Sequence, residues 1–223
     1  MDEQGTLPNP SDALRFIREN MRIAPVPLLP EIQLYTAHPA SGLWRLAGLE
    51  ADDPPPPYWA YQWAGGAVLA RHFLDRPETV RDCRVLDLGA GSGVVGIAAA
   101  KAGASQVIAA EIDPHGAAAI GLNAALNEVS ITVLAHDLTG GPPPTVDLVA
   151  VGDLFYEHDL ARQVETFLDR CLAAGIEVLI GDPGREFLPR SRLRVIAQYR
   201  VPDFGLAKGA SVKKSAVFSF ERE

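Results

Sequence analysis

From residue 84 onward, short apolar runs alternate with longer segments that have helical character. The apolar runs are continuous, without a polar residue at every second position, which is typical of parallel strands covered on both faces. The predicted strands are 84–88, 106–111, 131–136, 146–151 and 176–181, and the predicted helices are 92–102, 114–126 and 158–173. This alternation predicts an α/β fold with a doubly wound, mostly parallel sheet.

Two segments depart from the alternation. Residues 137–145, DLTGGPPPT, are too few and too rich in proline and glycine for a crossover helix, so we expect one layer of the fold to be thin there. The last two apolar runs, 193–201 and 215–221, follow each other without a helix between them. We therefore expect a C-terminal antiparallel hairpin at one edge, which completes a seven-stranded sheet.

The first 57 residues lack this pattern, and we interpret them as an N-terminal extension to a domain of residues 58–223. Ser11 or Asp12 can cap one short helix that ends near residue 20. The rest of the extension is rich in proline and is expected to be irregular, with short strands at most. The domain itself is expected to begin with a helix over about 62–74.

Composition narrows the classes of partner. The chain has 223 residues and a formal net charge of −8, which argues against a nucleic-acid partner. No apolar run approaches the roughly 18 residues of a membrane span, and the acidic, polar start does not resemble a targeting peptide. The cysteines and histidines lack the spacing of metal ligands. We therefore expect a cytoplasmic monomer without metal or membrane contact.

The segment VLDLGAGSGVVGIAAA, 85–100, predicts a strand, a glycine-rich turn and a helix. Glycines at such a turn let the backbone approach a ligand beside a helix start. Two cofactor classes fit: G-x-G-x-x-G from Gly91 matches a dinucleotide fingerprint, and D-x-G-x-G-x-G from Asp87 matches a loop that holds S-adenosylmethionine. Glu111, at the end of the second strand, could bind ribose hydroxyls in either class.

Three features favour S-adenosylmethionine. Gly89 follows the strand directly, and a fingerprint that begins at Gly91 leaves it unexplained. Asp87 lies inside an apolar strand, where its carboxylate can orient the glycine loop and receive the ammonium group of a methionine moiety, which a dinucleotide lacks. The antiparallel end of the chain leaves too few residues for the sixth parallel strand or the substrate domain of a dehydrogenase.

With these features assembled, the sequence resembles a known superfamily. VLDLGAGSG, AAEID, GDLFYE and the terminal hairpin resemble class I, seven-β-strand methyltransferases that use S-adenosylmethionine, over about residues 60–221. PPYWAYQWAGGAVLARHFLD, EIDP, GDLFYE and IGDPGR are similar to the protein-lysine methyltransferases of family 16. They look most like the bacterial form of the enzymes that methylate the β-subunit of electron transfer flavoprotein. The resemblance implies a Rossmann-like fold and a lysine of that β-subunit as the acceptor.

Individual residues can be assigned to the cofactor. Glu111 should bind both ribose hydroxyls, and Asp137 should accept a hydrogen bond from the adenine amino group. The resemblance places Trp63 near the cofactor. The complete predicted cofactor-binding set is Trp63, Asp87, Gly89, Gly91, Gly93, Glu111, Asp137 and Gly152.

Asp153 and Tyr156 form a D-x-x-Y pattern after the fourth strand and are the predicted catalytic residues. A free lysine amine has a pKa of about 10.4, and a carboxylate beside it favours its charged form. We therefore expect Asp153 to point toward the acceptor and orient its amine rather than act as a strong base. Four alternatives stay open: a ribosomal-protein acceptor, a small amine such as nicotinamide, a non-catalytic cofactor-binding module, and a nucleotide-dependent oxidoreductase.

Overall fold

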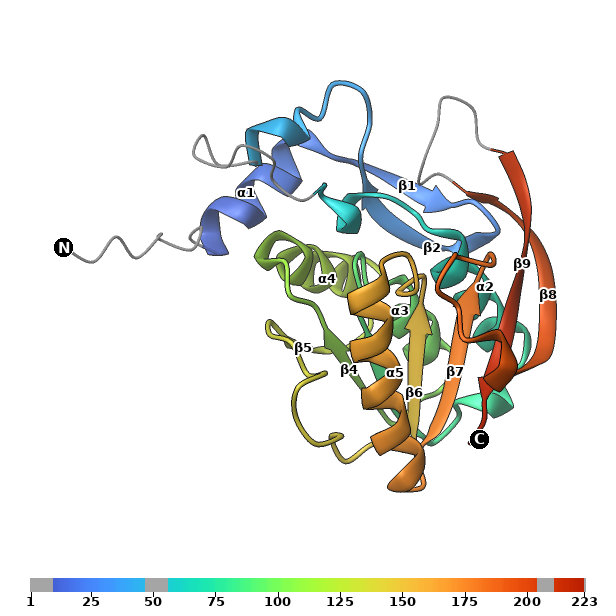
Figure 1. Cartoon of the computed structure of the whole chain (residues 1–223). Coiled ribbons are helices and arrows are strands. Elements are labelled where there is room, and N and C mark those ends of the chain that lie inside the picture. Colours follow the sequence, from blue (N-terminus) through green and yellow to red (C-terminus); the bar gives the residue numbers. More distant parts are fainter. Residues whose placement is uncertain (1–9, 47–55, 204–210, 223) are drawn as a thin grey trace.

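The computed structural model describes residues 10–46, 56–203 and 211–222, and its centre is a seven-stranded sheet (Figure 1). The strand order is β5-β4-β3-β6-β7-β9-β8, with β3 to β7 parallel and β9 antiparallel to both of its neighbours. The predicted fold class, including the C-terminal hairpin, is confirmed. The strands are β3 (Arg84–Leu88), β4 (Gln106–Ala110), β5 (Thr132–Leu134), β6 (Leu148–Gly152), β7 (Glu177–Asp182), β8 (Leu193–Asp203) and β9 (Ser211–Phe220).

Helices cover both faces of the sheet, as the continuous apolar strands predicted. In β6, Leu148 packs in the core beneath α2 and α3, whereas the next residue, Val149, packs in the core beneath α5. α4 packs through Ile120 on Ala109 of β4. The helices are α2 (Ala64–Asp75), α3 (Val94–Lys101), α4 (Pro114–Leu126) and α5 (His158–Ala173). Among the helices of the described residues, none is long and apolar enough to cross a membrane.

The layer on the α5 face is thin beside β5, as expected from the sequence. Residues 135–147, all of which the structure describes, connect β5 to β6 without a helix. The apolar core on that face therefore depends on α5, which contributes Val164, Phe167 and Leu168.

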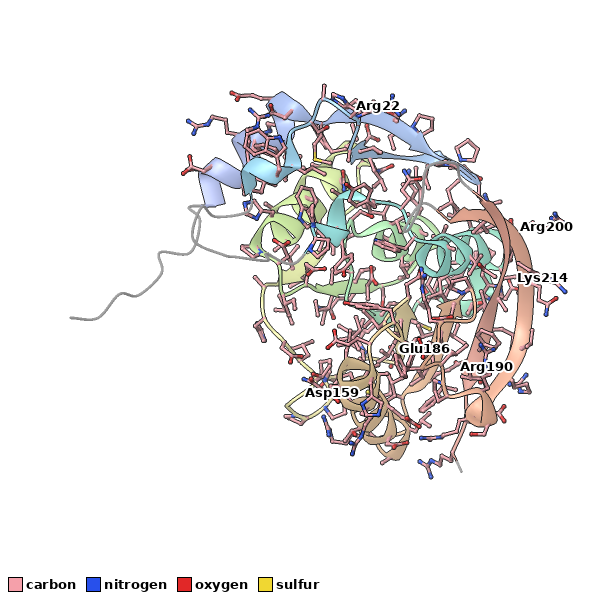
Figure 2. All side chains as sticks on the ribbon, turned by 45° about the horizontal axis from the view of Figure 1, so that its top comes forward. Arg22, Asp159, Glu186, Arg190, Arg200 and Lys214 are labelled. Carbon is pink, nitrogen blue, oxygen red and sulfur yellow. The ribbon has the colours of Figure 1, made fainter. Side chains whose placement is uncertain are left out.

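The outer hairpin carries charged side chains at the opposite edge of the sheet. Arg200 of β8 pairs in register with Lys214 of β9, and both side chains point away from the protein (Figure 2). Long charged side chains on an edge strand hinder pairing with strands of other chains. The antiparallel hairpin therefore ends the sheet with an edge that carries long charged side chains.

Residues 22–36 form the short strands that the sequence left possible. After α1 (Pro10–Asn20), the strands β1 (Arg22–Val26) and β2 (Leu29–Thr36) form an antiparallel hairpin whose register shifts between Pro25 and Val26. Each strand of a two-stranded sheet is an edge, where proline is tolerated. Buried Leu29, Ile32 and Leu34 of β2 join the core beneath α2 and α3.

Asn123 of α4 and Asn127, which directly follows α4, bind this hairpin to the sheet domain. Asn123 Oδ1 accepts a hydrogen bond from Tyr35 N (2.9 Å), and Asn127 Oδ1 accepts one from Gln33 N (3.0 Å). The unpaired edge of β2 thereby finds partners on the domain that it packs against. The division of the chain at residue 57 stays a prediction.

Candidate active site

The glycine loop after β3 holds three left-handed residues, with φ of +66° at Gly89, +54° at Gly91 and +80° at Gly93. Such conformations favour glycine because it lacks a β-carbon. A β-carbon on Gly89 would lie 2.7 Å from the Leu154 side chain, and one on Gly93 would lie 3.1 Å from Ile120. A β-carbon on Gly91 would meet only Trp59 Cα, at 3.7 Å. Gly91 is therefore the position of the loop that has room for a ligand.

Asp87 lies in β3 directly before this loop and contacts the helix that follows it. Its side chain is 1 % exposed, and Oδ2 accepts a hydrogen bond from Gly96 N in the first turn of α3 (2.8 Å). Burial raises the pKa of the Asp87 carboxyl to about 7, against the effect of the Gly96 bond. This bond joins β3 to the helix that follows the glycine loop, and the loop-orienting role of Asp87 stays a prediction. Its contact with a ligand's ammonium group stays a prediction.

Glu111 lies beside the open part of the loop. Its Oε2 accepts from Gly91 N (2.7 Å) and its Oε1 from Asp113 N (2.9 Å). Burial raises the pKa of Glu111, and these amide bonds oppose the rise. Gly116 in the first turn of α4 makes room for the side chains of Glu111 and Trp59, since a β-carbon on Gly116 would lie 2.8 Å from Glu111 and 3.2 Å from Trp59.

Trp59 closes the same space from the short 3₁₀ helix η2 (Tyr58–Ala60). Its indole is buried and stacks on His115 of α4, with ring centroids 6.3 Å apart. The buried Nε1–H has no partner among the described residues, although buried indole N–H groups usually find one. We call Gly91, Glu111 and Trp59 the glycine-loop cluster. It combines an open backbone position, a carboxylate and a spare donor.

Asp137 and Gly152 lie in contacts that are structural in character. Asp137 Oδ1 accepts from Thr139 N (2.8 Å), and Oδ2 accepts from Gln163 Nε2 of α5 (2.8 Å), so the carboxylate holds the turn after β5. A β-carbon on Gly152 would lie 3.0 Å from the backbone of Gly66, so this glycine lets α2 approach the sheet. Cofactor contacts for both residues stay predictions.

Asp153 follows β6 in a left-handed conformation, φ +56°, which is rare for a residue with a side chain. It is 6 % exposed, and Oδ2 accepts from the first N–H groups of α2, those of Gly65 (2.5 Å) and Gly66 (3.1 Å). Oδ1 accepts from Arg185 Nε (3.1 Å) and Nη2 (2.7 Å). Burial raises the pKa of Asp153 to about 6, and Arg185 opposes the rise.

This placement adds contacts that the sequence did not predict for Asp153. We expected the carboxylate to point toward the acceptor, and the structure engages both of its oxygens, by Arg185 and by the start of α2. The reason is that α2 has no side-chain cap of its own, and a helix start attracts a carboxylate from elsewhere in the chain. A catalytic role of Asp153 stays a prediction, now with a different geometry.

Arg185 is a residue of this site that the sequence analysis did not identify. It follows β7, and its backbone N–H donates to Oδ1 of the buried Asp182 (2.6 Å). Its guanidinium carbon lies 5.4 Å from the ring centroid of Trp63. The signal was present in IGDPGR, where an acid and an arginine follow a buried strand at the carboxyl edge of the sheet, as functional groups in α/β folds do.

Aromatic side chains lead from Arg185 to the surface. Trp63 Nε1 donates to Tyr58 O (2.8 Å), and the two rings meet edge to face at 5.5 Å. Tyr58 in turn lies 5.5 Å from Tyr156, which is 42 % exposed. Burial raises the pKa of Tyr156, with smaller contributions from Tyr58 and the negative charges of Glu157 and Glu111. We call Asp153, Arg185, Trp63, Tyr58 and Tyr156 the arginine cluster.

The structure thus brings the two predicted catalytic residues together with Trp63, and brings Glu111 together with the glycine loop. The two clusters are adjacent in the sequence, because Tyr58 of the arginine cluster directly precedes Trp59 of the glycine-loop cluster. No group of three or more metal-ligating side chains occurs within 10–46, 56–203 and 211–222.

Known proteins match this chain over different lengths, one over the middle of the chain and others over most of it. The family model described as Ribosomal protein L11 methyltransferase (PrmA) matches residues 68–152. The electron transfer flavoprotein beta subunit lysine methyltransferase of Rattus norvegicus is 38 % identical over 215 residues, which are 92 % of this chain and 83 % of the rat protein. The enzyme of the same name from Xenopus laevis is 39 % identical, over 92 % of this chain and 86 % of the frog protein.

Solved structures share the fold at low sequence identity. A 16S rRNA methyltransferase of T. thermophilus, in complex with AdoMet and guanosine, superposes with a TM-score of 0.56 at 18 % identity, over 92 % of this chain and 51 % of that one. A ribosomal protein L11 methylase of Lactobacillus delbrueckii superposes with a TM-score of 0.51 at 22 % identity, over 77 % and 92 % of the two chains. At these identities the likeness concerns the fold alone.

Proposed function

Because the chain belongs to the family of electron transfer flavoprotein β-subunit lysine methyltransferases, we propose that its own acceptor is a lysine of that β-subunit. The chain is an S-adenosylmethionine-dependent methyltransferase. The observation that carries the proposed acceptor is the extent of the match, which spans 92 % of this chain. The match to the L11 methyltransferase model ends at residue 152, before Asp153 and Arg185.

The glycine-loop cluster fits S-adenosylmethionine. The left-handed Gly91 is the least crowded position of the loop, the Glu111 carboxylate can accept from the ribose hydroxyls, and the buried Trp59 Nε1–H has no partner among the described residues. A carboxylate offers about four lone-pair sites, so the amide bonds to Glu111 leave acceptor capacity. When bound, the cofactor supplies a methyl group on a positively charged sulfur.

The arginine cluster supports an amine acceptor. In-line methyl transfer requires that the nitrogen be held about 3 Å from the methyl carbon and opposite the sulfur. Exposed Tyr58 and Tyr156 offer aromatic surface for the apolar stem of a lysine. The Tyr156 hydroxyl keeps its proton at neutral pH, because burial raises its pKa, and can hydrogen-bond the amine nitrogen.

A protein acceptor also agrees with the charge of the chain. The formal net charge of −8 disfavours nucleic acid, whose phosphates need a basic surface. A lysine-bearing surface is instead attracted to an acidic enzyme. We keep a cytoplasmic, monomeric enzyme as part of the proposal.

Purified enzyme, S-adenosylmethionine and the isolated β-subunit test this function directly. Mass spectrometry of the digested β-subunit should show methyl groups on lysine, and the Glu111→Ala variant, a control for contaminating activity, should leave the subunit unmodified. Ribosomal protein L11 and nicotinamide are incubated in parallel. Methylation of either of these without methylation of the β-subunit would overturn the proposed acceptor.

A further inference from the structure

The Asp153 carboxylate already holds a cation. Arg185 donates to Oδ1 from Nε (3.1 Å) and Nη2 (2.7 Å), and the side chains of Arg185 and Asp153 are 10 % and 8 % exposed, respectively. Paired donation of this kind fixes both groups in angle as well as in distance. An acceptor ammonium that approached Asp153 would therefore meet a carboxylate that is already paired with Arg185.

Contacts on three sides keep Arg185 in this position. Its backbone N–H donates to Asp182 (2.6 Å), and its guanidinium lies over the Trp63 ring (5.4 Å). The same guanidinium donates two hydrogen bonds to Asp153. Asp153 is fixed in turn by the N–H groups of Gly65 and Gly66 at the start of α2. Because removing one partner leaves a buried charge unpaired, the pair is expected to persist when an acceptor binds.

The aromatic side chains of the cluster lead from solvent to this guanidinium. Tyr58 and Tyr156 are 41 % and 42 % exposed, and Trp63 lies between Tyr58 and Arg185. A lysine has a four-carbon apolar stem and a compact charged head. With its stem along the aromatic rings, the head would end beside a fixed positive charge.

Resting on the lysine acceptor proposed above, we propose that Arg185 is a positioning residue that selects the neutral acceptor amine, by occupying Asp153 and disfavouring an ammonium group in the same site. The neutral nitrogen attacks the methyl carbon with its lone pair. The carbon–nitrogen bond forms as the carbon–sulfur bond breaks, and the electron pair of the broken bond stays on sulfur. The methylated ammonium then releases its extra proton to water.

Charged groups from several elements surround Arg185, so single substitutions among them change the local field. Asp153 at the end of β6 and Asp182 at the end of β7 face Arg185, and the positive start of α2 faces Asp153. Arg190 acts on Asp182, and Glu111 acts on the Tyr156 phenol, which lies beside that of Tyr58. Burial raises the pKa of Asp153 to about 6, so the carboxylate is ionised in the alkaline range where lysine loses its proton.

The test is the pH dependence of single-turnover methyl transfer at saturating cofactor and β-subunit. The wild-type rate should rise with pH to a plateau. Arg185→Gln removes the cation, so the midpoint should move up by about one pH unit, with about tenfold slower transfer at neutral pH, a difference of roughly 1.4 kcal/mol. Asp153→Asn leaves the cation unbalanced, so the midpoint should move down. Arg185→Lys should keep the wild-type midpoint.

Arg200→Gln is the control, because it removes an exposed arginine of β8 whose side chain points away from the protein (Figure 2), and it should leave the midpoint unchanged. A rate for Arg185→Gln lowered by one factor at every pH, or shifts of Arg185→Gln and Asp153→Asn in the same direction, would overturn the inference. If Arg185→Gln does not fold, Arg185→Lys and Asp153→Asn decide it by the midpoints given above. Absence of transfer by the wild-type enzyme would instead overturn the proposed function.

Discussion

Tyr58 and Trp59 are neighbours in the chain, yet they belong to two regions whose polar groups are satisfied in different ways. In the glycine-loop cluster, the Trp59 N–H has no partner among the described residues, and a β-carbon on Gly91 would meet only Trp59 Cα, at 3.7 Å. In the arginine cluster, the Trp63 N–H donates to a carbonyl and both oxygens of Asp153 are engaged. The first region has hydrogen-bonding capacity left for a ligand, whereas the second offers aromatic surface and a fixed charge.

This difference assigns the two ligands different modes of recognition. A cofactor with hydroxyl and amino groups gains bonds in the first region without displacing internal ones. An acceptor side chain in the second region gains apolar contact and meets an electrostatic field that the protein sets in advance, which costs no reorganisation during the reaction. Variants of the two regions should therefore separate cofactor affinity from acceptor chemistry.

The largest effect is expected at Gly65, on which the arginine cluster depends. A β-carbon there would overlap the Gly181 carbonyl oxygen and lie 2.5 Å from Asp153 Oδ2. Gly65→Ala should lower the free energy of unfolding by about 3 kcal/mol and abolish methyl transfer. Gly121→Ala in α4, where nothing lies within 4 Å, should raise the stability by about 0.5–1 kcal/mol. Equal urea midpoints for the two variants would contradict the close helix–sheet contact.

The next largest effect concerns the glycine-loop cluster. Glu111→Ala removes the carboxylate expected on the ribose hydroxyls and should weaken S-adenosylmethionine binding about a hundredfold, since bonds to a charged group contribute roughly 1.5–3 kcal/mol each. Calorimetry measures this affinity. The exposed Glu78→Ala should bind like the wild type. Wild-type affinity in Glu111→Ala would remove Glu111 from the cofactor site.

Buried Asp87 gives the glycine-loop side a pH dependence of stability. Its pKa, about 7, lies above that of an exposed aspartate, so between about pH 4 and 7 the folded state binds more protons than the unfolded state. Stability due to this group therefore falls as pH rises, by at most about 1.4 kcal/mol per unit. Asp87→Asn should become progressively more stable than the wild type over this window in urea unfolding.

Asp147→Asn controls for that experiment. Its exposed carboxylate has a pKa lowered to about 2 by hydrogen bonds from Arg84, so it is ionised in both states above about pH 5. The stability difference between Asp147→Asn and the wild type should therefore stay nearly constant between pH 5 and 7. A constant difference for Asp87→Asn as well would show that the Asp87 pKa is not raised by folding.

A smaller effect is expected at the outer end of the arginine cluster. Tyr156→Phe loses one hydroxyl near the acceptor and should slow methyl transfer about five- to tenfold, because a neutral hydrogen bond contributes about 1 kcal/mol. Cofactor affinity should not change. Tyr61→Phe alters a tyrosine of similar exposure outside the cluster and should leave the rate as in the wild type. Equal rates for both variants would remove the Tyr156 hydroxyl from acceptor binding.

The sequence predicted the sheet domain and the glycine loop because their determinants are local. Continuous apolar runs identify covered strands, and glycines at 89, 91 and 93 lie where the chain turns to the left-handed region. The pair of Asp153 and Arg185 joins residues from the ends of two strands, so no local pattern shows it. The contacts of Asp153 could not be predicted for the same reason, because they involve Gly65 and Gly66 at the start of α2.

The N-terminal hairpin could only be left possible, for another physical reason. Pro25 and Pro30 lie inside β1 and β2 and weaken the strand pattern, although an isolated two-stranded sheet accommodates proline. Besides the buried residues of β2, contacts about ninety residues away hold it in place, because Asn123 of α4 and the Asn127 that follows α4 hydrogen-bond the β2 edge. Contacts across such a separation are not visible in the pattern of either segment.

The central claim, that one region binds the cofactor and the other governs the acceptor, is tested most directly by the affinity of Arg185→Gln for S-adenosylmethionine. Calorimetry on this variant should give the wild-type affinity, in contrast to the hundredfold loss expected for Glu111→Ala, because Arg185 contacts Asp153 and Trp63 rather than the glycine loop. A folded Arg185→Gln protein that binds the cofactor as weakly as Glu111→Ala would contradict the division between the two clusters.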